Sequence, residues 1–231
     1  MHKLDESLLS GIPPFRKLER AEIREILDAA QALRFDGGVA VFSEGMAVER
    51  FFLLLDGHIR VVRTTPGGEQ IIALHIAPGQ LFGIGAAIGR STYPATAMTA
   101  DDCVALAWPN RLWPVFVERY EGFATETYRI VGDRVGEMNN RIVEMATQQV
   151  EQRIANAILR LVTQTGRKVE GGIEIGMPIT RQNLSDMTGS TLHTVSRLLS
   201  GWERDGIVLS ERRKITVTAP HRLVMLSGAA G

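Results

Sequence analysis

Apolar residues recur with two different periods along this chain, and the period changes near residue 34. Within 19–33, five apolar residues fall on one helical face: Ile23, Ile26, Leu27, Ala30 and Leu33. Steps of three and four residues are those of an amphipathic helix, because they place side chains on the same side of a 3.6-residue turn. The sequence therefore predicts a helix over residues 19–33.

Between residues 34 and 108 the pattern is that of antiparallel strands. Short apolar runs alternate with glycine-rich and proline-rich turns such as DGG at 36–38 and PGG at 66–68. The runs read VAVF, FFLLL, HIRVVR and QIIALHI. Strands of this length between such turns are typical of a small sandwich or barrel. We expect a β-roll domain that spans residues 1–110 together with the N-terminal helix.

A long helix is predicted after Arg111, where the glycines thin out. Six apolar residues follow one another in steps of 3, 4, 3, 4 and 3: Tyr128, Val131, Val135, Met138, Ile142 and Met145. Five strict steps favour a seam with the same helix of a second subunit, because a helix that faces only its own core needs no more than a 3.6-residue period. An ordinary core helix is the alternative. The charged residues between the seam positions, among them Arg134, Arg141 and Glu144, suit a solvated flank.

Three domains follow from these patterns. Residues 111–147 form the expected central dimerisation helix, and a boundary is expected near 147–150. A second apolar helix begins there with VEQRIANAILRLV, and a stretch rich in glycine and charge follows it at 166–176. Residues 148–231 make up the expected C-terminal domain.

The C-terminal domain carries the pattern of two short helices joined by a tight turn. Thr180 is a good N-cap for a helix that continues to about Met187. Gly189 supplies the turn, because a residue without a Cβ reverses the chain at little steric cost. Thr191 can cap a second helix. The arrangement predicts a helix-turn-helix; an αα-hairpin with a solvated polar face is the alternative.

The N-terminal end of the second helix carries the candidate base-reading side chains. They are Thr191, Leu192, His193, Thr194, Ser196 and Arg197. Donors and acceptors in the first turns of an inserted helix suit the base edges of the major groove, and Arg197 can bond guanine O6 and N7 together. Double-stranded DNA is therefore the expected partner.

Two further segments supply candidate contacts to the DNA backbone. Thr180, Arg181 and Gln182 begin the first helix, where they can meet phosphate oxygens. Two apolar strands near 207–209 and 215–217 flank a basic tip, which predicts a wing. The tip residues Arg212, Arg213 and Lys214 are expected near the phosphates.

Composition limits the function classes. The net charge is zero, but residues 150–231 hold eleven Lys and Arg against seven Asp and Glu, a modest basic excess that suits a polyanion. The sequence shows no apolar run long enough to span a membrane and no signal-peptide pattern, so we expect a cytoplasmic protein without membrane contact. No catalytic motif of the H-E-x-x-H, G-x-S-x-G or Walker type is present, which argues against an enzyme.

In the order of their elements and in three short motifs, these residues resemble the Crp/Fnr superfamily of transcription regulators. The motifs are R-I-A at 153–155, I-T-R-Q at 179–182 and T-V-S-R at 194–197. The resemblance covers about residues 10–225. It implies an α+β fold in which an antiparallel, cyclic-nucleotide-binding-like jelly roll precedes a dimerisation helix and a winged helix-turn-helix. It also implies a homodimer that binds a palindromic operator under the control of an effector and contacts RNA polymerase.

The resemblance assigns roles to some residues and leaves others in doubt. Arg197 matches the family arginine that reads a guanine. His193 stands where many members carry a glutamate that accepts from cytosine, so a different half-site is expected. The expected effector pocket comprises Phe82, Gly83, Ile84, Tyr93 and Ala95. Tyr93 and Pro94 occupy the positions of the arginine and serine that hold a cyclic phosphate, which argues against cyclic AMP.

The resemblance also allows two other sensing groups known in the family, an iron–sulfur cluster and heme, to be weighed against this sequence. A four-cysteine iron–sulfur cluster is excluded because Cys103 is the only cysteine, and it is expected to be buried. Heme stays open: His75 is a candidate axial ligand, although a structural role is favoured. Residues 93–97 and 191–197 look similar to nitric-oxide-responsive regulators of denitrification, which suggests a gas or another small molecule. A small-molecule-binding module without DNA binding is the alternative function.

Overall fold

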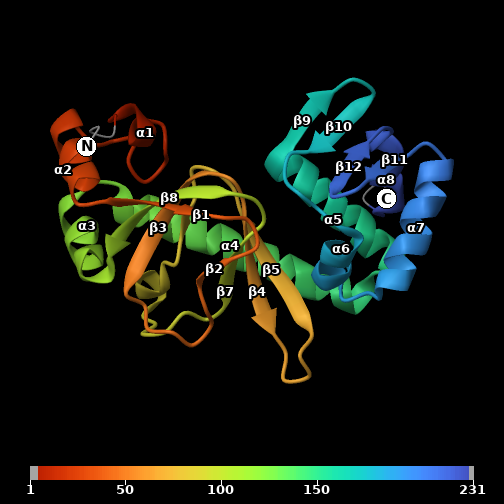
Figure 1. The fold of residues 1–231 in the computed structure, drawn as a ribbon, viewed down its shortest axis with the longest axis horizontal. Coiled ribbons are helices and arrows are strands. Elements are labelled where there is room, and N and C mark those ends of the chain that lie inside the picture. The colour runs from red at the N-terminus through yellow and green to blue at the C-terminus, as the bar shows by residue number, and fades with distance from the viewer. Residues whose placement is uncertain (1–4, 229–231) are drawn as a thin grey trace. The chain divides into compact units, whose positions relative to one another are not determined.

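A computed structural model describes residues 5–228, which fold into the α+β elements shown in Figure 1. The N-terminal part contains α1 (Ser7–Ser10), α2 (Arg20–Asp28), β1 (Gln31–Phe35), β2 (Ala40–Phe42), β3 (Arg50–Asp56), β4 (Ile59–Thr64), β5 (Gln70–Ile76), β6 (Leu81–Phe82), the 3₁₀ turn η1 (Gly85–Ile88), β7 (Thr96–Thr99) and β8 (Cys103–Pro109). The 3₁₀ turn η2 (Asn110–Leu112), α3 (Trp113–Arg119) and α4 (Phe123–Thr147) follow.

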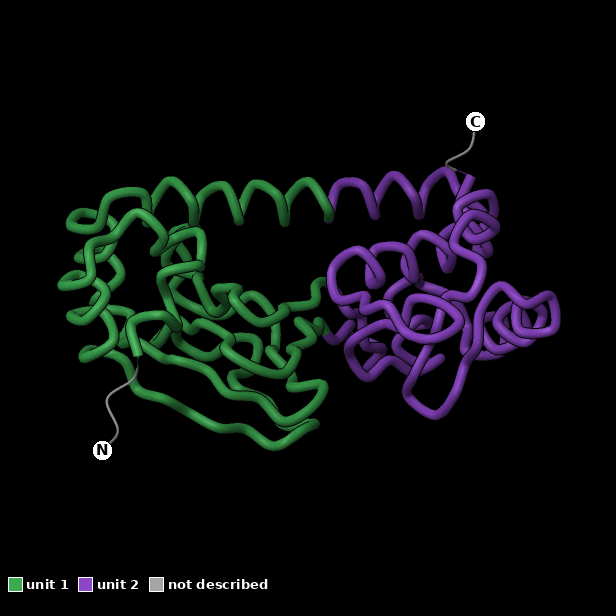
Figure 2. Tube along the Cα trace, turned by 90° about the horizontal axis from the view of Figure 1, so that it is seen from above, with its two compact units in different colours: residues 1–63, 74–137 green, residues 64–73, 138–231 purple. Residues whose placement is uncertain are grey.

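The C-terminal part is helical with one small sheet. Its elements are α5 (Val150–Thr165), β9 (Gly166–Val169), β10 (Gly172–Ile175), α6 (Arg181–Thr188), α7 (Leu192–Arg204), β11 (Val208–Glu211), β12 (Lys214–Val217) and α8 (Pro220–Leu226). The chain divides into two compact units (Figure 2). Unit 1 holds the chain up to residue 63 together with 74–137, and unit 2 holds 64–73 together with the chain from 138 onward.

Two four-stranded antiparallel sheets form the β-roll, with strand orders β1-β8-β3-β6 and β2-β7-β4-β5. Strand β3 is apolar at every position from Phe51 to Leu55 because both of its faces are buried. Phe52 and Leu54 enter a core cluster that also takes side chains from β4, β6 and β7. Phe51 and Leu53 point to the opposite side and pack under the helices.

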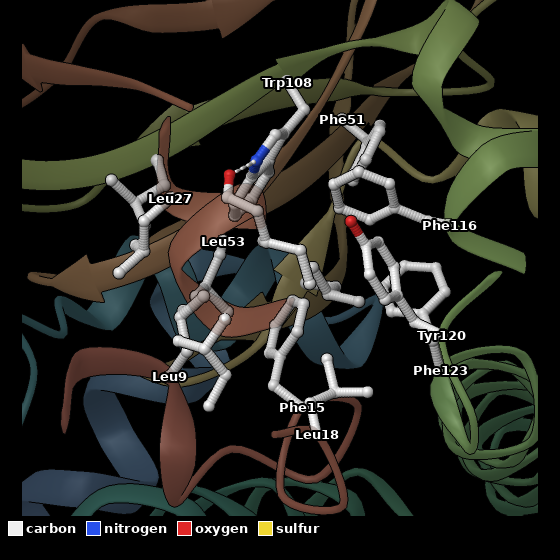
Figure 3. Packing of buried hydrophobic residues seen from close by; sticks show 14 of the residues in the cluster. Leu9, Phe15, Leu18, Leu27, Phe51, Leu53, Trp108, Phe116, Tyr120 and Phe123 are labelled. Atoms are coloured by element: carbon white, nitrogen blue, oxygen red, sulfur yellow. Dashed lines mark hydrogen bonds between the residues drawn. The ribbon is translucent and has the colours of Figure 1, made fainter. Parts of the chain in front are cut away.

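The second core cluster joins the first sheet to the N-terminal helices, α3 and the start of α4 (Figure 3). Phe51 lies 5.4 Å from Trp108 between ring centroids, and Phe123 lies 5.7 Å from Phe15. The indole N–H of Trp108 donates to the carbonyl of Ile26 at 2.8 Å, so its one polar atom is satisfied inside the core. Aromatic packing thus fixes where α4 begins.

The structure confirms the expected fold class: an antiparallel β-sheet domain, a long helix and a C-terminal helix-turn-helix with a small sheet. The helix expected over 19–33 is too long, since α2 ends at Asp28 and Leu33 belongs to β1. Leu33 pairs with Ala105 of β8, and its side chain packs on the core between the sheets. Leu33 does fall at a helical spacing in the sequence, but pairing with β8 places it in a strand.

Two other segments differ from the expectation. The stretch 166–176 forms the hairpin β9–β10, which completes a four-stranded sheet of order β11-β12-β10-β9. The segment after Arg111 forms two helices, because the chain turns at Gly122 with a φ of 82° before α4 starts at Phe123. None of the helices within residues 5–228 combines the length and the hydropathy that crossing a lipid bilayer requires.

Candidate nucleic-acid interface

Reciprocal hydrogen bonds fix the start of α6. The Thr180 hydroxyl accepts from the amide of Asn183 at 3.1 Å, and the Asn183 side chain accepts from the amide of Thr180 at 3.0 Å. This capping box satisfies two backbone donors that the helix itself leaves without partners. The oxygen of Thr180 is used internally, so this residue keeps only its hydroxyl hydrogen for a phosphate oxygen.

The turn between α6 and α7 is tightly constrained. Gly189 adopts the left-handed conformation with φ 59° and ψ 37°. Glycine is favoured in this conformation because it has no Cβ. The Ser185 hydroxyl donates to the carbonyl of Ser190 at 2.5 Å, and the Thr188 hydroxyl donates to the carbonyl of Leu184 at 2.7 Å. The first of these bonds ties α6 to the turn, and the second lies within the last turn of α6.

Helix α7 is anchored along one face and open along the other. Its buried face consists of Val195, Leu199 and Trp202. The indole N–H of Trp202 donates to Glu151 of α5 at 3.2 Å. Thr191 caps the helix by accepting from the amide of Thr194 at 3.2 Å. The first two turns are thereby held rigidly, which is what direct readout of base edges requires.

The expected base-reading side chains lie mostly outside the core. Thr191, Leu192, His193 and Arg197 are exposed, whereas Thr194 and Ser196 are half-buried. Within residues 5–228, the Arg197 guanidinium makes no hydrogen bond or ion pair. Its five N–H donors are therefore available to an external acceptor, and no internal bond has to break first.

The side chains at the start of α6 are less free. Arg181 lies 3.5 Å from the Ser200 hydroxyl and 3.4 Å from the Glu203 carboxylate of α7. The amide nitrogen of Gln182 donates to Asp186 at 2.7 Å. In the unbound chain Arg181 bridges the two helices, so a contact with a phosphate requires it to leave Glu203. Glu203 lies 22 residues further along the chain, too far for a local motif to predict this ion pair.

The wing forms as expected, with a basic tip on a constrained turn. Strands β11 and β12 pair antiparallel from Val208↔Val217 to Glu211↔Lys214. Arg212 and Arg213 are exposed at the tip, and the carbonyl of Arg213 accepts from the amide of Ile179 at 3.1 Å, just before α6. A cleft of about 560 Å³ lies between the tip and the start of α6, and Thr180, Arg181, Arg212 and Arg213 line it.

A carboxylate on β10 moderates the charge of the wing. Glu174 forms an ion pair with Arg167 and lies 3.5 Å from the Lys214 ammonium. The hydrogen bond from Arg167 lowers the pKa of the Glu174 carboxyl, which stays ionised at neutral pH. The charge of Lys214 is therefore partly neutralised.

Most of the apolar seam of α4 is exposed. Tyr128, Val135, Met138, Ile142 and Met145 are between 46% and 64% exposed. Val131 differs, because it packs on the core cluster beneath the N-terminal helices. A row of large apolar side chains of this length costs free energy in water unless a partner covers it. The seam does not serve the core of its own chain at these five positions.

The charged flank of α4 is solvated only in part. Arg129 and Asp133 are exposed as expected, whereas Arg134, Arg141 and Glu144 are half-buried. Arg134 donates to the carbonyl of Leu81 at 2.6 Å, and burial lowers its pKa to about 10, which leaves it charged at neutral pH. Glu144 pairs with Arg160 of α5 at 2.6 Å. Backbone carbonyls buried in the fold need donors, and long arginine side chains supply them. Local periodicity cannot reveal that requirement.

The expected effector positions are packed with aromatic rings. Tyr93 stacks on Phe42 with centroids 3.8 Å apart, and Phe82 stacks on Phe52 at 4.9 Å. The Tyr93 hydroxyl donates to the carbonyl of Arg50 at 2.6 Å, and burial raises its pKa. Ala95 is also buried. These side chains form an aromatic stack, defined here as Phe42, Phe52, Phe82 and Tyr93.

The neighbouring turn of the expected pocket divides between two cores. Gly83 has φ 66°, and a Cβ there would meet Phe52 at 2.9 Å. Ile84 packs on the core cluster beneath the N-terminal helices rather than on the aromatic stack. Phe82 and Ile84 are thus only two residues apart, but their side chains pack in two separate cores.

Cys103, His58 and His75 are the candidate metal and redox groups of the β-roll, and their surroundings differ. Cys103 is buried, and burial raises the pKa of its thiol to about 11. His58 lies 3.0 Å from Asp101 between ring Nδ1 and Oδ2. His75 is half-buried in β5. Within the described part of the chain, no three His, Cys, Asp or Glu side chains are grouped to hold a metal ion.

Comparisons with known proteins agree with this architecture. A CRP-like cAMP-activated global transcriptional regulator of Mycobacterium tuberculosis is 19% identical over 218 residues, which cover 94% of this chain and 97% of that protein. The nitrogen fixation regulation protein FixK of Bradyrhizobium diazoefficiens is 24% identical over 216 residues, covering 92% and 88%. The solved structure of FixK2 from Bradyrhizobium japonicum superimposes with a TM-score of 0.77 at 20% identity, covering 87% of this chain and 99% of that one.

Family profiles match both parts of the chain in order. A cyclic nucleotide-binding domain matches residues 32–120, and a Crp-like helix-turn-helix domain matches residues 152–226. Together with the fold, they define a DNA-binding transcription regulator that carries an effector-binding domain, and not an enzyme. The chain belongs to the Crp/Fnr family, whose members bind DNA and form dimers.

Proposed function

We propose that this chain acts as a homodimer that binds a two-fold-symmetric operator, with Arg197 reading a guanine in each half-site. The observation that carries the proposal is the Arg197 guanidinium, which is exposed and unbonded within residues 5–228 on a helix whose other face is anchored. Thr191, His193, Thr194 and Ser196 supply the neighbouring contacts. Two such helices reach successive major grooves about 34 Å apart.

Contacts to the DNA backbone complete the proposed interface. The exposed tip residues Arg212 and Arg213 meet phosphates. Lys214 does so after it leaves Glu174. Thr180 and Gln182 add hydrogen bonds at the start of α6. Arg181 contributes after it exchanges Glu203 for a phosphate oxygen.

Selection of genomic DNA fragments with the purified protein tests the sequence specificity. We expect enrichment of a motif with two inverted half-sites one helical turn apart. The same selection with Arg197→Ala is expected to lose the enrichment at one base of each half-site. Failure to enrich any motif, with or without candidate effectors, would instead support a small-molecule-binding module that does not bind DNA.

The proposed dimer interface is the exposed row on α4. Ile142→Glu is expected to give a monomer in sedimentation experiments, because dimerisation would bury two facing carboxylates without partners. Asn140→Glu, on an exposed part of the same helix away from the row, is the matched control and should stay dimeric. A dimeric Ile142→Glu variant would remove this face from the interface.

We propose that the effector is a small molecule other than a cyclic nucleotide or an iron–sulfur cluster. The aromatic stack supports the first exclusion, because it offers an anionic phosphate no cation where Tyr93 and Pro94 stand. The single buried cysteine supports the second. Isothermal titration with cyclic AMP is expected to give no heat of binding, and saturable binding would refute the first exclusion.

A gas, sensed directly or through heme, is the first effector to test. The likeness of residues 93–97 and 191–197 to nitric-oxide-responsive regulators supports this choice, and His75 is the candidate ligand. An absorbance spectrum of protein from heme-replete cells, recorded with and without nitric oxide, tests it. In vitro transcription with RNA polymerase, the proposed protein partner, then shows whether the same effector changes transcript yield.

A further inference from the structure

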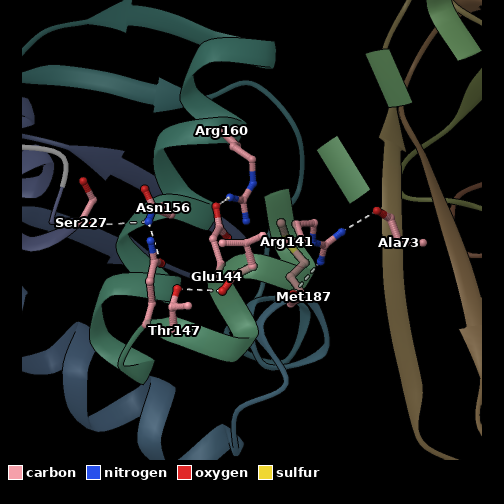
Figure 4. Close-up of polar contacts among 10 residues, drawn as sticks. Ala73, Arg141, Glu144, Thr147, Asn156, Arg160, Met187 and Ser227 are labelled. Atoms are coloured by element: carbon pink, nitrogen blue, oxygen red, sulfur yellow. Dashed lines mark hydrogen bonds and ion pairs between the residues drawn. The ribbon is translucent and has the colours of Figure 1, made fainter. Parts of the chain in front are cut away.

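One arginine on α4 bonds to two elements far apart in the sequence. Arg141 donates to the carbonyl of Ala73 at 2.5 Å and to that of Ile72 at 2.9 Å, both in β5. The same guanidinium donates to the carbonyl of Met187 in α6 at 2.5 Å (Figure 4). All of these residues belong to unit 2. A planar guanidinium with five donors can hold several carbonyls at once, whereas an ammonium group cannot fix their relative directions.

The bond to Met187 falls where the first helix of the helix-turn-helix needs donors. The last carbonyls of an α-helix lack partners within the helix, and cations are favoured there. Arg153 of α5 serves the next carbonyl, that of Thr188, at 3.1 Å. The C-terminal end of α6 is therefore capped by two guanidinium groups, one from α4 and one from α5.

Arg141 and Arg153 differ in their other backbone contacts. The other backbone contact of Arg153 is the carbonyl of Gln148 at 3.0 Å, next to its own helix. Arg141 instead reaches β5, a strand that continues to Ile76 in the core of the β-roll, where Phe82 also packs. Gly189 follows the capped carbonyls directly, and a Cβ there would lie 3.4 Å from Met145 of α4. The turn that leads from α6 into α7 therefore begins two residues after Met187, whose carbonyl accepts from Arg141.

We propose that Arg141 is a positioning residue for DNA binding, which couples the backbone of β5 at Ile72 and Ala73 to the C-terminal end of α6. A displacement of these β5 carbonyls changes the guanidinium's position, and the Met187 carbonyl follows or loses its donor. A constrained turn joins α7 to α6, so the orientation of α7 changes when α6 moves. The step to DNA rests on the proposed function, whereas the coupling itself does not.

Hydrogen exchange of the DNA-free protein tests the coupling. In Arg141→Met the amides of Gly189 and Ser190 and those of residues 70–73 are expected to exchange about tenfold faster, because bonds to a charged donor are lost at both ends. Arg134→Met is the matched control, since Arg134 also extends from α4 to a carbonyl, that of Leu81, but does not reach α6. Arg141→Lys keeps the charge and should restore only part of the protection.

A double-variant cycle separates coupling from simple capping. Ile72→Ala loosens β5 at a residue that is only 2% exposed. It should accelerate exchange at Gly189 and Ser190 when Arg141 is present, and should add nothing in Arg141→Met. Additive effects would overturn the proposal, as would faster exchange at α6 alone, because Arg141 would then be only a cap.

Operator spacing gives the functional readout. Arg141→Met is expected to bind the best-spaced operator about tenfold more weakly and to discriminate less against spacings altered by about one base pair. Affinity for a single half-site and the salt dependence should not change, because Arg141 contacts no phosphate. Unchanged spacing preference would refute the positioning role. If the wild-type chain binds no symmetric DNA, the proposed function fails while the exchange result still decides the coupling.

Discussion

Arg197 and Tyr93 were both expected at functional sites, and the structure gives them opposite surroundings. Arg197 extends from an anchored helix without an internal partner among the described residues. Tyr93 is 4% exposed, stacks on Phe42 and donates its hydroxyl hydrogen to Arg50. The first site keeps its donors available for a rigid external polymer. At the second site the Tyr93 hydroxyl already donates to a backbone carbonyl of the same chain. An effector must therefore displace part of the aromatic stack or bind elsewhere.

This comparison predicts that substitutions in the aromatic stack lower stability, whereas substitution of Arg197 lowers the affinity for DNA. Phe82→Ala should lower the free energy of unfolding by about 3–5 kcal/mol, because it empties a buried ring position in the aromatic stack. Chemical denaturation measures the loss. The affinity of the folded variant for a single half-site should equal that of the wild type. A variant of normal stability would show that the stack is not tightly packed.

Arg197→Ala should have the reverse effect. We expect operator affinity to fall by about 1–3 kcal/mol and one base position to become permissive, with no change in the free energy of unfolding. Gel shifts against operators mutated one base at a time measure both. Arg204→Ala is the control, since this exposed arginine lies at the other end of the same helix. Equal losses in the two variants would mean that α7 contributes only charge.

A smaller effect is expected at the wing. Lys214→Ala should weaken binding to all sequences alike and reduce the slope of log affinity against log salt by about one. Its ammonium already lies near Glu174, so the loss should be less than for Arg212→Ala, at the exposed tip of the same wing. Filter binding over a range of salt concentrations checks this order. A loss confined to one operator would place Lys214 at a base instead.

The smallest effect should come from the cysteine. With a thiol pKa of about 11, Cys103 holds its proton from acid to mildly alkaline pH, and only the thiolate reacts. Alkylation at neutral pH should therefore be slow in the folded protein and fast after denaturation, and should accelerate as the pH approaches the thiol pKa. Cys103→Ala should bind operator normally. Rapid modification of the native thiol would contradict a closed β-roll.

Local signals predicted the conformation of the helix-turn-helix better than they predicted that of the β-roll. Thr180, Gly189 and Thr191 act within four residues of themselves, as caps and turn, and all three have the expected conformation. Leu33 fits a helical face equally well, but its strand is decided by a partner more than 70 residues away in β8. The hairpin β9–β10 is not predicted because both strands have only four residues, and β9 is fully exposed and carries two adjacent charges, at Arg167 and Lys168.

Side-chain partners were the least predictable feature of the candidate site. Arg181 and Arg197 look alike in sequence, yet only Arg181 has a carboxylate, Glu203, within reach. Arg141 was expected to be solvated, since nothing in a heptad shows that backbone carbonyls of β5 and α6 converge beside it. Positions on a helix face follow from periodicity, but what faces them is set by the fold.

The backbone of Arg213 has a consequence for how the wing meets a partner. It adopts φ 62°, and it is the one residue other than glycine with a positive φ among residues 5–228. Glycine would adopt this turn with less strain, but it would also leave the unbound tip with more accessible conformations. With arginine there, much of the ordering entropy is lost during folding rather than on association. The wing should therefore dock as a preorganised element with a small entropic penalty.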